Sequence, residues 1–84
     1  MTYQVFIKHS AERELNSLRG GLFDRIKRKL LSLEGNPRPF GVQKLQGQDA
    51  YRIRVGDYRI LYLIDDEAKR LEIISISHRR EAYR

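Results

Sequence analysis

Arg52, Arg54 and Arg59 lie within one short stretch of this 84-residue chain. Guanidinium groups carry forked donors that match phosphate oxygens, so a cluster of them favours an anionic ligand. Four more residues with useful chemistry follow near the C-terminal end: His78, Arg79, Arg80 and Tyr83. A single arginine on an exposed strand is usually only solvated, so the prediction of a site depends on the convergence of the whole set.

This combination of side chains suits cleavage of RNA without a metal ion. The ribose 2′-OH attacks the adjacent phosphate, and guanidinium groups stabilise the extra negative charge of the transition state. Arginine has too high a pKa to act easily as the base that takes the 2′-OH proton. Histidine is the residue type best suited to exchange a proton near neutral pH, so His78 is a candidate, and Tyr83 could transfer a proton or stack on a base. Simpler alternatives stay open, with His78 capping a strand end and Tyr83 anchoring the tail.

A β-hairpin is needed to bring the three arginines together, and residues 51–64 predict one. Alternating apolar residues flank Gly56-Asp57, and a two-residue Gly-Asp link between such runs is typical of a hairpin. The turn fixes the register, which places Arg54 opposite Arg59 on one face. The same register sets Arg52 opposite Leu61 on that face. The apolar pairs share the other face: Tyr51 with Tyr62, Ile53 with Ile60, and Val55 with Tyr58.

Further strands and helices must complete and cover this sheet. Residues 2–8 alternate like a strand, and Ser10 is predicted to cap a short helix that ends at Gly20-Gly21. From Leu22 to Leu33 apolar residues recur every three or four positions, as in an amphipathic helix. The rest predicts a loop, a short extended segment, a polar turn and a last strand: 36–41, 42–45, 65–70 and 71–78.

The last strand should run antiparallel to the second strand of the hairpin. If Asp65 pairs with Arg70, one set of residues joins the apolar face: Leu71, Ile73 and Ser75. The alternate set then joins the arginine face: Ile74, Ile76 and His78. A β-bulge would reverse this assignment.

The order of elements predicts an α+β fold, in which an N-terminal strand and a helical hairpin pack on one face of a small, mainly antiparallel sheet. We expect one domain, residues 1–84. Lys and Arg number 17 against 11 acidic residues, a net charge of +6. This excess favours RNA, DNA or an acidic protein as partner, although a solubilising surface is the alternative.

Composition also excludes several classes of site. The chain has no cysteine, so it can form no disulfide, thiolate nucleophile or Cys-based zinc site. The run Asp65-Asp66-Glu67 could suggest a divalent metal, but a polar turn is the favoured interpretation. We therefore expect no metal and no cofactor. No apolar run is long enough for a membrane span or a leader, which predicts a cytoplasmic protein without membrane contact.

Two segments, YRIRVGDYRILYLID and ISISHRREAYR, together resemble the RelE branch of the RelE/ParE toxins of bacterial and archaeal toxin–antitoxin systems. The similarity spans nearly the whole chain, including the helical hairpin and the NPRP loop. It implies a RelE-like microbial ribonuclease fold. It also implies an endoribonuclease of the mRNA interferase type, which cuts mRNA in the A site of the ribosomal 30S subunit. It also implies a cognate antitoxin protein that wraps the toxin and blocks its basic face.

The resemblance also implies roles for individual residues. Arg52 and Arg54 match the family's basic strand pair, Arg59 its phosphate-binding arginine, Arg79 its C-terminal arginine and Tyr83 its tyrosine. His78 stands where several members have a basic residue or a histidine. Three more residues are predicted to bind RNA: Lys44, Arg80 and Arg84. The best-studied branch has lysines in place of Arg52 and Arg54, so the identity of the general base stays open, and we expect no C-terminal helix of the kind that some members have.

Two functions of other classes remain alternatives. A ParE-like toxin would bind DNA gyrase and cut no RNA, and the HRREAY ending argues against it because that role needs no such cluster. A basic RNA- or ribosome-binding module would bind with steep salt dependence and leave the message intact.

Overall fold

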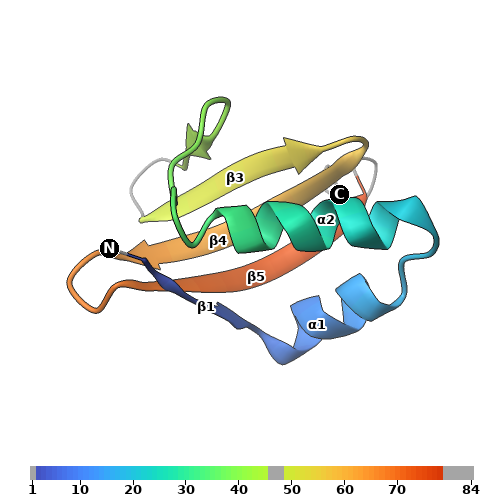
Figure 1. The fold of residues 1–84 in the computed structure, drawn as a ribbon, viewed down its shortest axis with the longest axis horizontal. Coiled ribbons are helices and arrows are strands. Elements are labelled where there is room, and N and C mark those ends of the chain that lie inside the picture. Colours follow the sequence, from blue (N-terminus) through green and yellow to red (C-terminus); the bar gives the residue numbers. More distant parts are fainter. Residues whose placement is uncertain (1, 46–48, 79–84) are drawn as a thin grey trace.

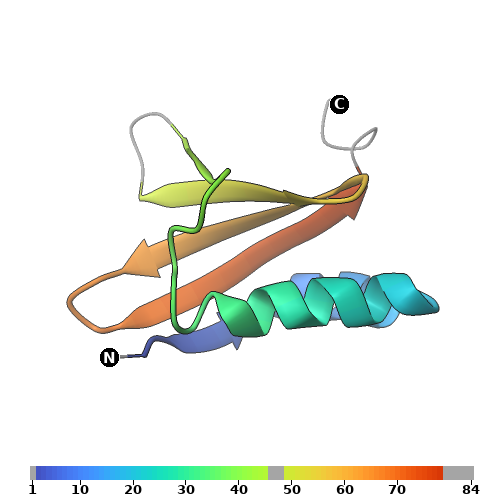
Figure 2. The same ribbon diagram turned by 45° about the horizontal axis from the view of Figure 1, so that its top comes forward.

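A five-stranded sheet with two helices on one face forms the computed structural model, which describes residues 2–45 and 49–78 (Figure 1). The elements are β1 (Gln4–Ile7), α1 (His9–Asn16), α2 (Gly21–Ser32), β2 (Gln43–Lys44), β3 (Ala50–Val55), β4 (Tyr58–Asp65) and β5 (Arg70–His78). The strand order is β1-β5-β4-β3-β2, with β1 parallel to β5 and the other pairs antiparallel. Figure 2 shows both helices in one layer against one face of the sheet, which confirms the α+β prediction.

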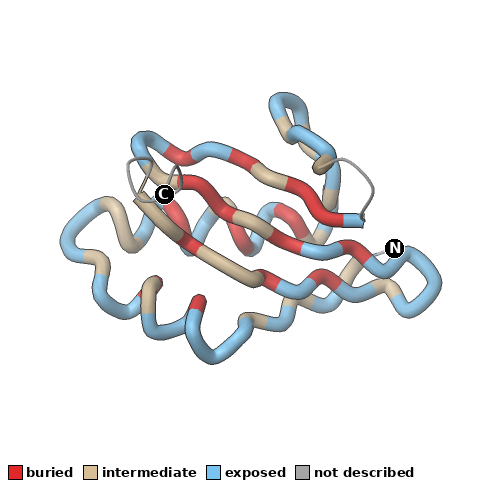
Figure 3. The backbone as a smooth tube through the Cα atoms, turned by 180° about the vertical axis from the view of Figure 1, so that it is seen from behind, coloured by how far each residue is buried: buried red, intermediate tan, exposed pale blue. Residues whose placement is uncertain are grey.

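The hairpin of β3 and β4 has the predicted turn and register. Gly56 adopts a φ of 60°, in the left-handed region that glycine enters without strain. Arg54 lies opposite Arg59 and Arg52 opposite Leu61, as expected. Buried residues alternate with more exposed ones along β3 (Figure 3), so one face of the hairpin meets the helices and the other carries the arginines.

The core lies between the sheet and the two helices. Each helix turns one apolar stripe towards the sheet, as its spacing of three and four residues requires. The core residues from the helices and the turn after α2 are Ala11, Leu15, Ile26, Leu30 and Leu33, and those from the sheet are Tyr51, Ile53, Val55, Ile60, Tyr62, Ile64, Leu71, Ile73 and Ile76. Among the described residues, no helix is both long and apolar enough to cross a membrane.

The ends of α1 differ from the prediction. The helix begins at His9 with Lys8 as its N-cap, so the predicted cap at Ser10 is wrong. The reason lies in β1, because the Lys8 N–H donates to the Ile73 carbonyl at 2.9 Å and the chain turns from strand directly into helix. α1 ends at Asn16, and Gly20, with φ 62°, precedes α2 instead of terminating α1.

A β-bulge in β5 changes which side chains face the helices. Asp65 pairs with Arg70 as predicted, but the register shifts by one residue between Leu61 and Tyr62. Tyr62 lies opposite Ile73 and Leu61 opposite Ser75, which leaves Ile74 as the extra residue. The assignments of Ser75 to the core and of Ile76 and His78 to the arginine face are therefore wrong. The bulge places Ile76, only 2% exposed, in the core instead of a serine hydroxyl.

The same part of β5 depends on α1 for a hydrogen bond. β1 pairs with β5 only as far as Ile73. Further along β5, the N–H of Ile76 donates to the carboxylate of Glu14 on α1 at 3.0 Å. A helix side chain thus takes over from the neighbouring strand and satisfies a buried backbone donor.

Candidate nucleic-acid interface

The three hairpin arginines line one hollow on the sheet face that the helices leave uncovered. Its volume is about 260 Å³, and its lining residues are Gly41, Gln43, Arg52, Arg54 and Arg59. The arginines share this hollow because alternation along β3 and the cross-strand pair of Arg54 with Arg59 point them to one side. Like charges opposite each other on a sheet are destabilising, so an anion bound here would relieve a repulsion that the fold itself creates.

Arg59 is the most enclosed of the three. It lies on β4, with Arg54 opposite on β3 and Ser77 opposite on β5, and it is only 9% exposed. Arg59 is thus largely shielded from solvent, although neither helix covers this face of the sheet. Attraction between charges is weaker where water surrounds them, so an enclosed guanidinium attracts a phosphate more strongly than an exposed one.

Arg52 is held in position from the sheet edge. Its Nη2 donates to the side-chain oxygen of Gln43, the residue opposite it on β2. This contact fixes the Arg52 guanidinium beside the hollow and uses only one of its five N–H donors. Arg54, by contrast, is exposed, so the hollow has one enclosed, one tethered and one exposed arginine.

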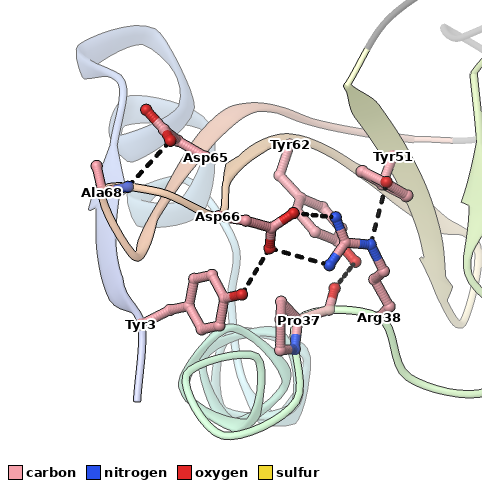
Figure 4. Close-up of polar contacts among 8 residues, drawn as sticks. All are labelled: Tyr3, Pro37, Arg38, Tyr51, Tyr62, Asp65, Asp66 and Ala68. Carbon is pink, nitrogen blue, oxygen red and sulfur yellow. Dashed lines mark hydrogen bonds and ion pairs between the residues drawn. The ribbon is translucent and has the colours of Figure 1, made fainter. Parts of the chain in front are cut away.

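The loop between α2 and β2 forms the wall of the hollow at Gly41, and Arg38 anchors this loop (Figure 4). Its Nη1 and Nη2 donate to the two carboxylate oxygens of Asp66 at 3.2 and 2.8 Å, and its Nε donates to the Tyr51 hydroxyl at 3.1 Å. The Tyr3 hydroxyl donates to Asp66 at 2.6 Å. The Tyr62 hydroxyl donates to the Pro37 carbonyl at 2.7 Å. The network therefore ties the loop to β3, β4, the β4–β5 turn and Tyr3, the residue that precedes β1.

This network shifts the pKa values of its members. The hydrogen bonds from Arg38 and then Tyr3 lower the pKa of Asp66 to about 2. The hydrogen bonds to Asp66 and then Tyr51 raise the pKa of Arg38 above its usual value. Burial raises the pKa of Tyr62 to about 12. All three groups thus keep one protonation state near neutral pH, which suits a structural anchor rather than a proton-transfer role.

The opposite end of the uncovered face has a different character. A second hollow, of about 760 Å³, lies around the β4–β5 turn and is lined by Phe6, Asp49, Leu63, Ile64, Asp65, Asp66, Glu67, Arg70, Leu71 and Glu72. Five of these ten residues are acidic and only Arg70 is basic. The face is therefore polarised, with positive charge towards β2 and β3 and negative charge towards the β4–β5 turn.

Comparisons with known proteins agree with this architecture. Residues 5–83 match a family model described as the ParE toxin of the type II toxin–antitoxin system parDE. The chain belongs to the RelE/ParE toxin family. It is 30% identical over 88 residues to a Methanocaldococcus jannaschii protein with the provisional name toxin RelE1, which covers 100% of this chain and 98% of that protein.

Solved structures of RelE proteins share the fold. The archaeal RelE–RelB complex from Pyrococcus horikoshii OT3 is 35% identical, with a TM-score of 0.85, over 94% of this chain and 97% of that one. The toxin–antitoxin complex RelBE2 from Mycobacterium tuberculosis is 27% identical, with a TM-score of 0.81, over 94% of this chain and 100% of that one. The protein is thus a toxin of the RelE/ParE type with a RelE-like fold.

The structure separates the predicted site residues into three groups. Arg52, Arg54 and Arg59 come together, as expected. His78 lies opposite Tyr58 and meets its ring edge-on at 5.3 Å between centroids, on the side of the sheet that faces the helices. Lys44 lies opposite the buried Tyr51, whereas its neighbour Gln43 faces the arginines. The predicted position of His78 on the arginine face is therefore wrong. Lys44 was predicted only to bind RNA, and it does not join the three arginines of the hollow. Four predicted residues lie outside the described part of the chain: Arg79, Arg80, Tyr83 and Arg84.

Sequence reasoning missed other parts of the hollow. Gly41 and Gln43 were assigned only to a loop and a short extended segment. The alternation of β2 against β3 could have placed Gln43 beside Arg52, once the pairing was known. Ser77 reaches a position opposite Arg59 only because of the bulge, which the sequence pattern did not reveal.

Proposed function

We propose that this toxin is a metal-independent endoribonuclease that cleaves mRNA in the ribosomal A site and so inhibits translation. The observation that carries the proposal is the hollow lined by Arg52, Arg54 and Arg59. Membership of the RelE/ParE family and the RelE-like fold support it, because RelE-like toxins in general are mRNA interferases.

In the proposed reaction the 2′-OH of one nucleotide attacks the phosphate on its 3′ side. The new bond closes a 2′,3′-cyclic phosphate, and the bond to the 5′ oxygen of the next nucleotide breaks. Negative charge accumulates on the non-bridging oxygens, and preorganised donors lower the barrier most when they meet that charge. Arg59 is suited to this role because it is enclosed, while Arg52 and Arg54 would hold the neighbouring backbone.

Two proton transfers complete the reaction. The 2′-OH must lose a proton as it attacks, and the departing 5′ oxygen must gain one. The three arginines of the hollow are poor bases, so they stabilise charge without taking the first proton. We assign the proton transfers to the C-terminal residues, with Tyr83 as the leading candidate and Arg79 as a further phosphate contact.

The distribution of charge on the uncovered face supports one path for the RNA. Phosphates would be repelled by the acidic hollow around the β4–β5 turn and attracted to the β2–β3 end. We therefore place the scissile phosphate over Arg59 and route the strand along the β2 edge, past Gln43 and Gly41.

A cognate antitoxin is the second partner that we propose. The similar proteins from Pyrococcus horikoshii and Mycobacterium tuberculosis were solved as complexes of toxin with antitoxin. An antitoxin for this chain would inhibit it by covering the arginine hollow. An acidic segment of the antitoxin would complement the toxin's net charge of +6.

The test is to map new mRNA 5′ ends in a translating extract after adding the toxin, with and without ribosomes. We expect cuts in phase with codons only when ribosomes are present. Arg59→Ala should slow cleavage by about 10²–10³, the usual loss for one preorganised donor. Arg28→Ala is the matched control, because Arg28 is an exposed arginine on α2, on the helix side of the sheet.

Other outcomes would point to the alternative functions. Double-strand DNA breaks with intact messages would favour a ParE-like gyrase toxin. The family model that matches this chain is named for the ParE toxin, so this alternative is worth testing. Binding to ribosomes without any new 5′ end would favour a non-catalytic module. If Arg59→Ala cleaves RNA at the same rate as Arg28→Ala, the hollow is not part of the active site.

A further inference from the structure

Phe40 is an aromatic residue that the fold leaves fully exposed. The other exposed large apolar residues of the described chain keep part of their surface covered, at 42% exposed for Phe6, 52% for Leu31 and 37% for Leu63. Full exposure forgoes the stabilisation that burial of such a side chain provides. An aromatic ring held entirely in solvent is thus a candidate for contact with a ligand.

The position of Phe40 connects it to the arginine hollow. Its chain neighbour Gly41 lines the hollow, and consecutive Cα atoms lie only about 3.8 Å apart. Gly41 has a φ of 91°, which turns the chain sharply after Phe40. Figure 2 shows the segment between α2 and β2 passing from the helix layer to the edge of the sheet at β2. Phe40 therefore precedes a residue that lines the hollow, and its ring is within reach of a ligand bound there.

The loop that carries Phe40 is fixed rather than loosely tethered. Arg38 is bound by Asp66 and Tyr51, and the Pro37 carbonyl accepts a hydrogen bond from Tyr62 (Figure 4). The Val42 N–H donates to the Pro39 carbonyl at 3.1 Å and closes a turn around Phe40 and Gly41. After this turn the chain is held by β2, where Gln43 pairs with Arg52 on β3. Anchors on both sides reduce the entropy that a ligand would lose by ordering the loop.

We propose that Phe40 is a stacking platform for a base of the single-stranded RNA whose phosphates occupy the arginine hollow. The proposal rests on the proposed function and adds a base contact to it. Aromatic rings beside basic grooves bind single-stranded nucleic acids in this way, and the contact tolerates any base because each has a π-face. A protein partner would be expected to meet a contiguous apolar patch, whereas the hollow beside the Phe40 loop is lined by three arginines, a glutamine and a glycine.

The chain offers a direct probe of this contact because it contains no tryptophan. In Phe40→Trp the single indole would report on stacking through quenching of its fluorescence. The ligands are a short 2′-O-methyl RNA, which lacks the attacking hydroxyl, and an abasic oligonucleotide with the same number of phosphates. We expect the base-bearing oligonucleotide to quench the indole and the abasic one to bind without quenching. Leu31→Trp, which places an indole at an exposed apolar position on α2, should show no quenching with either.

Affinity measurements complete the test. Phe40→Ala should weaken binding of the base-bearing oligonucleotide by about 5- to 150-fold, the range for one stacked base, and leave the abasic one unchanged. Equal affinity of Phe40→Ala and the native protein for the base-bearing oligonucleotide would overturn the stacking role, even if Arg59→Ala still weakens both ligands and so supports the hollow. Weakened binding of the cognate antitoxin alone would overturn it in favour of a protein contact. If neither oligonucleotide binds the native protein, both proposals are wrong: phosphate binding by the arginine hollow and base stacking on Phe40.

Discussion

Replacement of Arg54 with glutamine removes one of the three guanidinium groups from the hollow without touching the core. Arg54 is exposed, and substitutions at such positions usually change stability by less than about 0.5 kcal/mol. Arg28→Gln on α2 is the matched control, because it also exchanges an exposed arginine for glutamine and lowers the net charge of +6 by one. The two variants therefore differ only in where the charge is lost.

The expected effect follows from the number of phosphates that the hollow neutralises. For single strands, the slope of log K against log salt concentration is about −0.7 per phosphate neutralised. If each of the three arginines neutralises one phosphate, they contribute about −2.1 to the slope, and Arg54→Gln reduces this to about −1.4. Between 50 and 200 mM salt, the loss of affinity from these contacts then falls from about 18-fold to about 7-fold.

Fluorescence anisotropy of a labelled 2′-O-methyl RNA, titrated at several salt concentrations, measures this slope. We expect the slope of Arg28→Gln to equal that of the native protein. Equal slopes for Arg54→Gln and Arg28→Gln would mean that the RNA responds to overall charge only. That result would refute the assignment of phosphates to the hollow.

Three further predictions concern the contacts that hold the site in place. Tyr62→Phe should lower the free energy of unfolding by about 0.5–1.5 kcal/mol, because it removes the hydrogen bond to the Pro37 carbonyl. Thermal unfolding measures this loss. The control Tyr58→Phe, on the same face of β4, should show no such loss. Glu14→Ala should cost about 1–3 kcal/mol in the same assay, since it leaves the buried Ile76 N–H unsatisfied. Asp66 has a pKa lowered from 3.8 to about 2, so its contribution to stability is present above pH 4 and disappears as the pH falls towards 2. Urea unfolding of Asp66→Asn should accordingly show a smaller loss of stability over that range than the native protein, and an equal loss would contradict the anchor.

The hairpin was predictable because its information is local. A Gly-Asp turn allows few geometries, and a period of two fixes every side chain once the turn is set. The register therefore matches from Val55 opposite Tyr58 to Tyr51 opposite Tyr62. The cluster of Arg52, Arg54 and Arg59 follows from the same two features.

The bulge in β5 was not predictable from alternation, because the segment alternates in two ways at once. Leu71, Ile73 and Ser75 form one series, and Ile74 and Ile76 form another. The burial of hydroxyls decides between them, since a core serine needs a hydrogen-bond partner while Ile76 needs none. The apolar spacing of three from Ile73 to Ile76 was the available sign of an extra residue.

The anchor of the NPRPFG loop depends on contacts between distant residues. Arg38 and Asp66 are separated by 28 positions, and Tyr3 and Asp66 by 63. Asp66 was correctly assigned to a polar turn, but nothing near it in the sequence identifies its partner. The rim of the hollow is therefore set by tertiary packing, while its arginines are set by local pattern.

The bulge also divides the chemistry of the proposed active site. It directs Ser77 to the arginine side and His78 towards Tyr58, so the one described histidine of the C-terminal region is turned away from the hollow. The hairpin then supplies charge stabilisation without a base, since an arginine cannot readily accept the 2′-OH proton. The attacking hydroxyl must therefore be aligned and deprotonated by other groups, and we propose Tyr83 for the proton transfer. In the proposed function, the ribosome would supply the alignment, because it would hold the message in the required geometry.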